Sequence, residues 1–387
     1  MRTIYLTLAL TFTLILVNAQ QKSDRESQNP VITSVNQNIN WYDVQKQSSP
    51  ILQGVSWNEE LRGTFGRLPL RAKASVRSDV WGLSENCAGI TIRFKTNASE
   101  IKVIYQVSSA PSFNHMTATG VSGLDLYTSD RQGKAVWSSG AFSFGDTIKY
   151  TFKNLNSFAS EPTNREYQLF LPLYNHVKWM EIGLPTDAEL SWITPSTEKP
   201  LVVYGTSIAQ GGCASRAGMA WTGILNRELP YPLINLAFSG NGLLEKEVLN
   251  FINEIDAQLY ILDCLPNLVG RSAEEIEKAT LEAVQQIRTL HKTPILLVEH
   301  PGYNDGFVDK KKFESYIRAN NASKAAYKKL KADGVHDLFY LSYEEINMPM
   351  DGTVDGIHST DYGMRAYADA YEKKIRKILH TPTQLKK

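Results

Sequence analysis

The chain has 387 residues, with 41 Lys and Arg against 40 Asp and Glu, and a formal net charge of +1. This length suits two domains, each large enough to bury an interior of its own. The balanced charge gives no field that would recruit nucleic acid or an anionic membrane surface, so we expect no nucleic-acid partner.

The first 19 residues have the pattern of a secretory signal peptide. One Arg precedes an apolar run from Ile4 to Val17, and small Ala19 precedes polar Gln20. We therefore predict cleavage after Ala19 and a secreted or periplasmic location. An N-terminal membrane anchor is the alternative, but the run is shorter than the roughly 20 apolar residues that a span needs. No later segment has that length, so we expect no membrane span in the mature chain.

Three cysteines, Cys87, Cys213 and Cys264, are too few for a disulfide framework. One bridge at most is possible, and the sequence does not select the pair.

Residues 20–40 form a polar leader that we expect to stay outside the fold, because it has no sustained hydrophobic period. From 41 to 195 the pattern has period two: Ile90, Ile92 and Phe94 alternate with polar residues, and the segment 101–107 repeats this alternation. The pattern predicts an all-β sandwich or jelly-roll domain without helices.

After the segment 194–200, short apolar strands alternate with helical stretches, which is typical of a parallel sheet covered on both faces. We expect strands at 201–204, 233–236, 258–262, 295–299 and 338–341. One helix should begin at a capping box of Ser272 and Glu275, and another should run from about Asp361 to Ile378. The apolar stripe of the first helix is Ile276, Ala279, Ala283, Ile287 and Leu290. We therefore predict an α/β domain over residues 196–387.

Ser207 follows the first strand of this domain, where ligands bind in open parallel sheets. It could cap the next helix or act as a nucleophile. Asp355 and His358 lie three residues apart in the loop before the last helix. A hydroxyl attacks well only when a base removes its proton and a carboxylate orients that base, so the three residues predict a Ser-His-Asp triad.

Two further residues follow strands and could stabilise an oxyanion. Gly240 can offer a backbone N–H and Asn267 a side-chain amide, although either alone could be an ordinary loop residue. His300 follows the fourth strand and could touch substrate or simply close a loop. No zinc spacing, calcium loop or phosphate-binding Gly motif is present, so we expect no metal or cofactor.

These blocks resemble those of the SGNH (GDSL-type) hydrolases. The matching residues are Gly205-Thr206-Ser207, Gly240, Asn267 and Asp355-Gly356-Ile357-His358. The resemblance implies a flavodoxin-like α/β/α domain with a five-stranded parallel sheet. It also implies that Ser207 is the nucleophile, that His358 and Asp355 complete the triad, and that Ser207, Gly240 and Asn267 form the oxyanion hole. Two blocks depart from the family: Thr206 stands in place of Asp, and 265–268 lacks the usual Gly-x-Asn-Asp.

The segment GLDLY, Gly123 to Tyr127, resembles a motif of the β domain that precedes a subgroup of these esterases. It could be a turn entering a strand, or Asp125 and Tyr127 could have a binding role.

The resemblance implies a secreted serine esterase acting on short acyl esters, with an O-acetylated carbohydrate or another small ester as substrate. The polar loop 207–215 does not resemble an acyl-chain groove. The alternatives are a lipase, lysophospholipase or thioesterase for longer chains, and a carbohydrate-binding protein that has lost catalysis.

Overall fold

The computed structural model describes residues 34–36, 38–155 and 164–381. The predicted signal peptide and residues 20–33 of the predicted leader lie outside these ranges. Within the described part of the chain, no helix is both long enough and apolar enough to cross a membrane.

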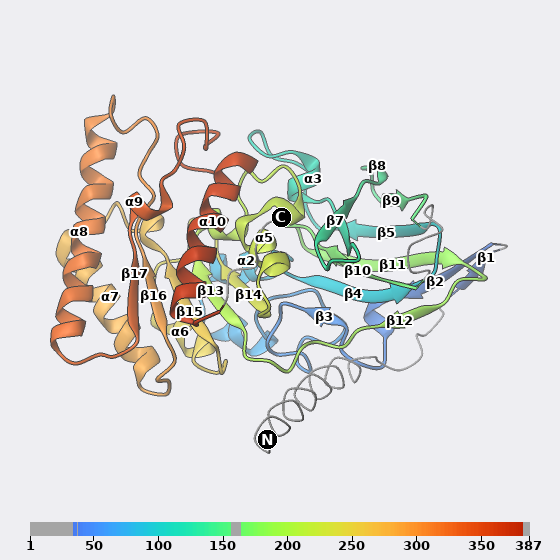
Figure 1. The fold of residues 1–387 in the computed structure, drawn as a ribbon, viewed down its shortest axis with the longest axis horizontal. Helices are drawn as coiled ribbons and strands as arrows, with labels where there is room; N and C mark the ends of the chain where they lie inside the picture. The colour runs from blue at the N-terminus through green and yellow to red at the C-terminus, as the bar shows by residue number, and fades with distance from the viewer. Residues whose placement is uncertain (1–33, 37, 156–163, 382–387) are drawn as a thin grey trace, which may run out of the picture.

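The first half of the molecule is a sandwich of two antiparallel sheets, as predicted (Figure 1). One sheet has the order β1 (Ser34–Asn36), β2 (Ile39–Asp43), β11 (Val177–Pro185), β5 (Ile101–Val107), β9 (Ile148–Phe152) and β8 (Ala141–Ser143). The other has the order β12 (Leu190–Trp192), β4 (Thr91–Thr96), β10 (Arg165–Phe170), β6 (Asp125–Ser129) and β7 (Ala135–Ser138), with β3 (Leu52–Gln53) also paired to β4. The alternating apolar residues of β4 and β5 face the core: Ile92, Phe94, Ile101, Val103 and Tyr105 are each fully buried.

Two expectations for this half were wrong. The sandwich contains helices α2 (Ser78–Ser84) and α3 (Ala118–Val121) and the 3-10 turns η1 (Val44–Lys46) and η2 (Leu70–Ala74). Helices this short carry too few periods to be seen in a sequence, and tertiary packing stabilises them. The predicted leader also ends too late, because β1 pairs with β2 before residue 41.

The second half contains one parallel sheet of five strands, in the order β14-β13-β15-β16-β17. The strands are β13 (Leu201–Gly205), β14 (Leu233–Ala237), β15 (Leu259–Asp263), β16 (Ile295–Val298) and β17 (Leu338–Leu341). They match the five predicted strands within a residue or two. From β13 the chain proceeds to β14 on one side and then to β15 on the other, so the strand order switches at β13, and its carboxyl end is where ligands bind in such sheets.

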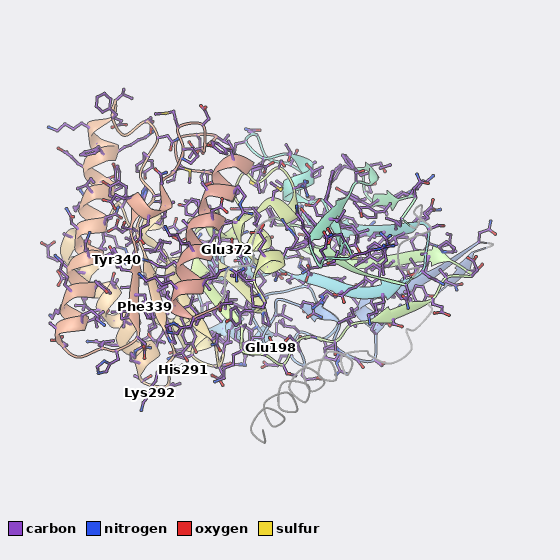
Figure 2. All side chains as sticks on the ribbon, in the orientation of Figure 1. Glu198, His291, Lys292, Phe339, Tyr340 and Glu372 are labelled. Carbon is purple, nitrogen blue, oxygen red and sulfur yellow. The ribbon has the colours of Figure 1, made fainter. Side chains whose placement is uncertain are left out.

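Helices cover both faces of this sheet (Figure 1). The helices and 3-10 turns of this half are α4 (Ser207–Gln210), η3 (Ala217–Met219), α5 (Trp221–Glu228), α6 (Lys246–Ile252), η4 (Leu265–Asn267), α7 (Ala273–Arg288), α8 (Lys310–Ala332), α9 (Tyr343–Ile346) and α10 (Asp361–Ile378). Figure 2 labels two neighbouring residues of β17 that pack on different faces of the sheet. Phe339 packs against the cluster that includes α5 and α10, whereas Tyr340 packs against the one that includes α7 and α8. The capping box of Ser272 and Glu275 is present. Leu290, however, lies beyond the end of α7 and is 70% exposed, so its place in the predicted stripe was wrong.

All three cysteines, Cys87, Cys213 and Cys264, are buried free thiols. No pair of them forms the single bridge that their number would have allowed.

The GLDLY segment joins the two halves. Asp125 is 3% exposed, and its Oδ2 accepts hydrogen bonds from Arg216 Nη1 at 2.8 Å and from the Gly218 N–H at 2.7 Å. Its Oδ1 accepts from Trp137 Nε1 at 3.0 Å, and Arg216 Nη1 also donates to the Tyr127 hydroxyl at 2.7 Å. The two Leu residues of the motif point into the sandwich core. The motif therefore enters a strand and also binds the loop that follows α4.

A buried arginine makes a second connection between the halves. Arg67 is 1% exposed and donates to the carbonyl oxygens of Asn235 at 3.1 Å and Ala237 at 2.7 Å, at the end of β14. It also donates to the carbonyls of Leu83 at 2.6 Å and Asn86 at 2.8 Å in its own half. Burial lowers the pKa of Arg67 to about 10, so it remains charged at neutral pH. Its charge is balanced by carbonyl dipoles that both halves supply.

Asp263, at the end of β15, is buried against α10. It is 1% exposed, and this burial raises the pKa of its carboxyl from 3.8 to about 7, which the nearby Tyr371 hydroxyl offsets only in part. The folded protein therefore holds a proton on Asp263 at pH values where the unfolded chain has released it.

We predict that Asp125→Asn lowers the free energy of unfolding by about 3 kcal/mol, because it leaves the Arg216 guanidinium without its carboxylate in a largely buried interface. Denaturant titration of the full chain measures this change. Asp187→Asn, in the exposed turn between β11 and β12, is the matched control and should change stability little. Equal stability of the two variants would contradict the role of the motif in joining the halves.

We also predict that Asp263→Asn gains stability relative to wild type as pH rises. Between about pH 5 and about pH 7 the unfolded chain ionises this carboxyl while the folded protein keeps it protonated, so wild-type stability falls through this window. The Asn variant has no such titration. Free energies of unfolding at intervals from about pH 5 to about pH 8 measure the difference, and a difference that stays constant would argue against a raised pKa.

Candidate active site

Ser207 is the first residue of α4, directly after β13. Thr206 is the N-cap residue, so the alternative in which Ser207 caps the helix was wrong. Thr206 is fully buried, and a carboxylate at this position would be withdrawn from water at considerable cost. The Thr206 hydroxyl is also buried, and it has no hydrogen-bond partner among the residues that the structure describes.

Tertiary hydrogen bonds hold α4, which has only four residues. The buried Gln210 accepts from the Ser239 N–H at 2.9 Å and donates to the Leu173 carbonyl at 3.3 Å. The Tyr174 hydroxyl donates to the Ser207 carbonyl at 3.0 Å. Both Leu173 and Tyr174 belong to the sandwich half. A single helical turn is not stable by itself, so these bonds fix the position of Ser207.

The structure brings Ser207, His358 and Asp355 into one chain of hydrogen bonds. Ser207 Oγ lies 2.8 Å from His358 Nε2, and His358 Nδ1 lies 2.7 Å from Asp355 Oδ2. The Asp355 Oδ1 atom accepts from the backbone N–H groups of His358 at 2.8 Å and Ile357 at 3.2 Å. The ring is thereby oriented with one nitrogen toward the hydroxyl and the other toward the carboxylate.

Partial burial of Asp355 by itself would raise its pKa, but the hydrogen bonds from the His358 ring and from the backbone N–H groups together lower it. The carboxylate therefore stays ionised in the range where an imidazole titrates. An ionised carboxylate beside Nδ1 favours the tautomer in which Nε2 can accept a proton.

The loops that carry Gly240 and Asn267 meet at the end of β13. Gly240 has φ +68°, a left-handed conformation that favours glycine. At Gly242 a Cβ atom would lie 2.0 Å from the Gly205 carbonyl oxygen, so this loop can pass β13 only with glycine. The Asn267 amide is oriented so that its oxygen accepts from the N–H groups of Asn241 and Gly242, both at 3.1 Å. Its NH2 group then points away from these two N–H groups.

His300 does not reach the site. It is fully buried, its Nδ1 accepts from the Gly302 N–H at 3.0 Å, and its ring stacks on Tyr316. Burial lowers its pKa to about 3, so the ring is neutral. Of its two predicted roles, closing a loop fits this position, and contact with substrate does not.

A cleft of about 560 Å³ opens at His358, the hydrogen-bond partner of Ser207, and both halves of the molecule line it. The α/β half contributes Gly212, Ser239, Asn241 and His358, and the sandwich half contributes Ser78, Asp79, Gly82, Leu83, Phe113, His115 and Tyr174. Sequence reasoning missed every residue of the second group. They lie in loops and a short helix of another domain, and no local pattern marks them.

Two family models match the chain in succession. The family described as GDSL-like lipase/acylhydrolase matches residues 198–376, and the N-terminus of Esterase_SGNH_hydro-type, named for its GxDLY motif, matches residues 39–190. No curated protein matches the sequence.

Several solved structures are similar. A GDSL-like lipase from Bacteroides ovatus ATCC 8483 is 32% identical with a TM-score of 0.80, over 90% of this chain and 100% of that one. The salicylyl-acyltransferase SsfX3 from a tetracycline biosynthetic pathway is 16% identical with a TM-score of 0.63, over 94% and 100%. A family two carbohydrate esterase from Cellvibrio japonicus is 13% identical with a TM-score of 0.53, over 88% and 98%.

The last two likenesses, at low identity, establish a shared fold alone. The first extends over both halves at an identity that indicates common descent, and the two family models match in the same order. The chain therefore belongs to the GDSL-like lipase/acylhydrolase family of SGNH hydrolases, in the form that carries an N-terminal GxDLY domain.

Proposed function

We propose that this protein is an exported serine esterase that removes acetyl or other short acyl groups from carbohydrates. The observation that carries the proposal is the chain of hydrogen bonds from Ser207 Oγ through His358 to Asp355, at 2.8 and 2.7 Å. This arrangement supplies a nucleophile, a base and a group that orients the base. The signal pattern of residues 1–19 supports export.

In the proposed reaction, Ser207 Oγ attacks the ester carbonyl carbon while His358 Nε2 takes its proton. Three N–H donors, from the backbone of Ser207 and Gly240 and from the Asn267 amide, stabilise the oxyanion. His358 then protonates the departing alcohol. Water, deprotonated by His358, releases the acid from the acyl-enzyme and restores Ser207. No metal or cofactor takes part in these steps.

Both polar and apolar side chains line the cleft. Hydroxyl, carboxylate, imidazole and amide side chains from Ser78, Asp79, His115, Ser239 and Asn241 line it. A site for a long acyl chain would be lined mainly by aliphatic and aromatic residues. Leu83, Phe113 and Tyr174 line the cleft as well, and this mixed lining suits an alcohol that carries hydroxyl groups on an apolar ring.

Ser207→Ala should abolish ester hydrolysis without loss of folding. The substitution removes the nucleophile, and α4 is held by Gln210 and Tyr174 rather than by the Ser207 hydroxyl. Acetate release and thermal unfolding of the full chain measure the two effects. Ser143→Ala, on the exposed strand β8, is the matched control. Substantial hydrolysis by a folded Ser207→Ala protein would refute the triad.

The length of the acyl chain that the protein prefers distinguishes a short-chain esterase from a lipase or thioesterase. With p-nitrophenyl esters of two to sixteen carbons, we expect the highest kcat/KM at acetate and a steady fall with chain length. The protein should also release acetate from acetylated polysaccharides. A maximum at long chains would instead indicate a lipase or thioesterase. Binding of carbohydrate without hydrolysis of any ester would indicate a protein that has lost catalysis.

A further inference from the structure

One wall of the cleft is a loop of the sandwich half that stands beside His358. This loop, residues 108–116, connects β5 to α3 on the side of the sandwich facing the α/β half (Figure 1). The rings of Phe113 and His115 are stacked, with centroids 6.3 Å apart and an interplanar angle of 20°. The His115 ring centroid lies 5.9 Å from that of His358. A flat ring surface therefore begins next to the proposed base.

The loop is held in place from several sides. Phe113 and Met116 exchange two backbone hydrogen bonds, at 3.1 and 3.2 Å, which close a tight turn around His115. Phe113 also meets Tyr174 edge to face, at a centroid distance of 6.0 Å. At its start, the buried Asn175 donates to the Ser109 carbonyl at 3.1 Å and accepts from the Ser109 N–H at the same distance. The ring stack is therefore preorganised rather than formed on binding.

The chemistry of the triad determines which part of the ester meets this wall. His358 must return its proton to the departing alcohol, so the alcohol lies on the His358 side of Ser207. The atoms of the alcohol beyond its oxygen then reach His115 and Phe113. Phe113 is 40% exposed, and its open surface gains stability when an apolar face covers it.

Polar side chains at the start of α2 also line this cleft. Ser78 and Asp79 lie at the start of α2, and the Asp79 carboxylate is 72% exposed, at 3.8 Å from Arg77. Arg77 is itself fixed by Glu245 and by a 2.8 Å bond to Asn241. The same cleft thus offers an alcohol flat rings, a carboxylate and a hydroxyl.

We propose that Phe113 and His115 form the leaving-group subsite of the enzyme, and that this subsite binds a sugar ring. A sugar ring carries C–H groups on its face, which suit the stacked rings, and hydroxyl groups at its edge, which suit Asp79 and Ser78. An aromatic alcohol would contact the stacked rings but leave Asp79 and Ser78 without hydrogen-bond partners. This inference rests on the proposed esterase function and specifies its alcohol.

The test compares three acetyl esters by acetate release: xylose tetraacetate, phenyl acetate, and ethyl acetate, whose alcohol is too small to cover the rings. The measured quantity is the kcat/KM for xylose tetraacetate divided by the kcat/KM for ethyl acetate. Phe113→Ala should lower this ratio about tenfold, an effect of the size expected for one lost ring contact. His115→Ala should lower it in the same direction, and Phe113→Trp should keep it near the wild-type value.

Phe307→Ala is the matched control, because Phe307 is 99% exposed and lies outside the cleft. Thermal unfolding shows whether each variant is folded. Because Phe113→Ala and His115→Ala are measured separately, the subsite can still be tested if one of them misfolds. A ratio that does not change in folded Phe113→Ala and His115→Ala proteins overturns the subsite. A larger loss on phenyl acetate than on xylose tetraacetate overturns the sugar in favour of an aromatic alcohol. Absence of all ester hydrolysis in the wild type overturns the proposed function and this inference together.

Discussion

The site depends on how a one-turn helix is held. Helix α4 carries Ser207 but has too few internal hydrogen bonds to be stable alone. Residues outside the helix set its position: Ser239 and Leu173 bond to the Gln210 side chain of α4, and the Tyr174 hydroxyl donates to the Ser207 carbonyl. Ser207, the loop that carries Ser239 and Gly240, and the sandwich are therefore parts of one hydrogen-bonded unit.

The coupling of the two halves explains what the GLDLY motif does in this chain. A buried carboxylate is costly unless it is fully paired, and Asp125 is paired with a guanidinium, a backbone N–H and an indole N–H. Two of these donors, from Arg216 and Gly218, belong to the loop that leaves α4. Arg67, also in the sandwich half, donates to the Ala237 carbonyl at the end of β14. The sandwich thus holds both the loop that follows α4 and the end of β14.

The two halves contribute different groups to the site. The polar groups that would act on the ester bond come from loops after the parallel strands, where the sheet geometry brings them together. The wall that would meet the alcohol comes from the sandwich. Loops on a second domain can change without disturbing the hydrogen bonds of Ser207, His358 and Asp355, so in the proposed enzyme substrate choice and catalysis would be set by different parts of the chain.

Much of this was determined by the sequence alone. Local patterns encode the period-two strands, the continuous apolar strands and the capping box at Ser272, because these features depend on neighbours within a few residues. The residues Ser207, Asp355 and His358 could also be found, since each lies at a fixed place relative to a strand or helix. The short helices α2 and α3 and the strand β1 could not, because tertiary contacts stabilise them.

Other features were decided only by the tertiary structure. His300 follows a strand as Asn267 does, yet it packs into the interior against Tyr316 and does not face the cleft. Two partners of Asp125, Arg216 and Gly218, lie about 90 residues away in the sequence, and His358, one of the two rings beside His115, lies in the other domain. Such pairings form when the two halves pack against each other. The energy of that packing is spread over contacts between residues far apart in the sequence, so no short stretch of sequence reveals them.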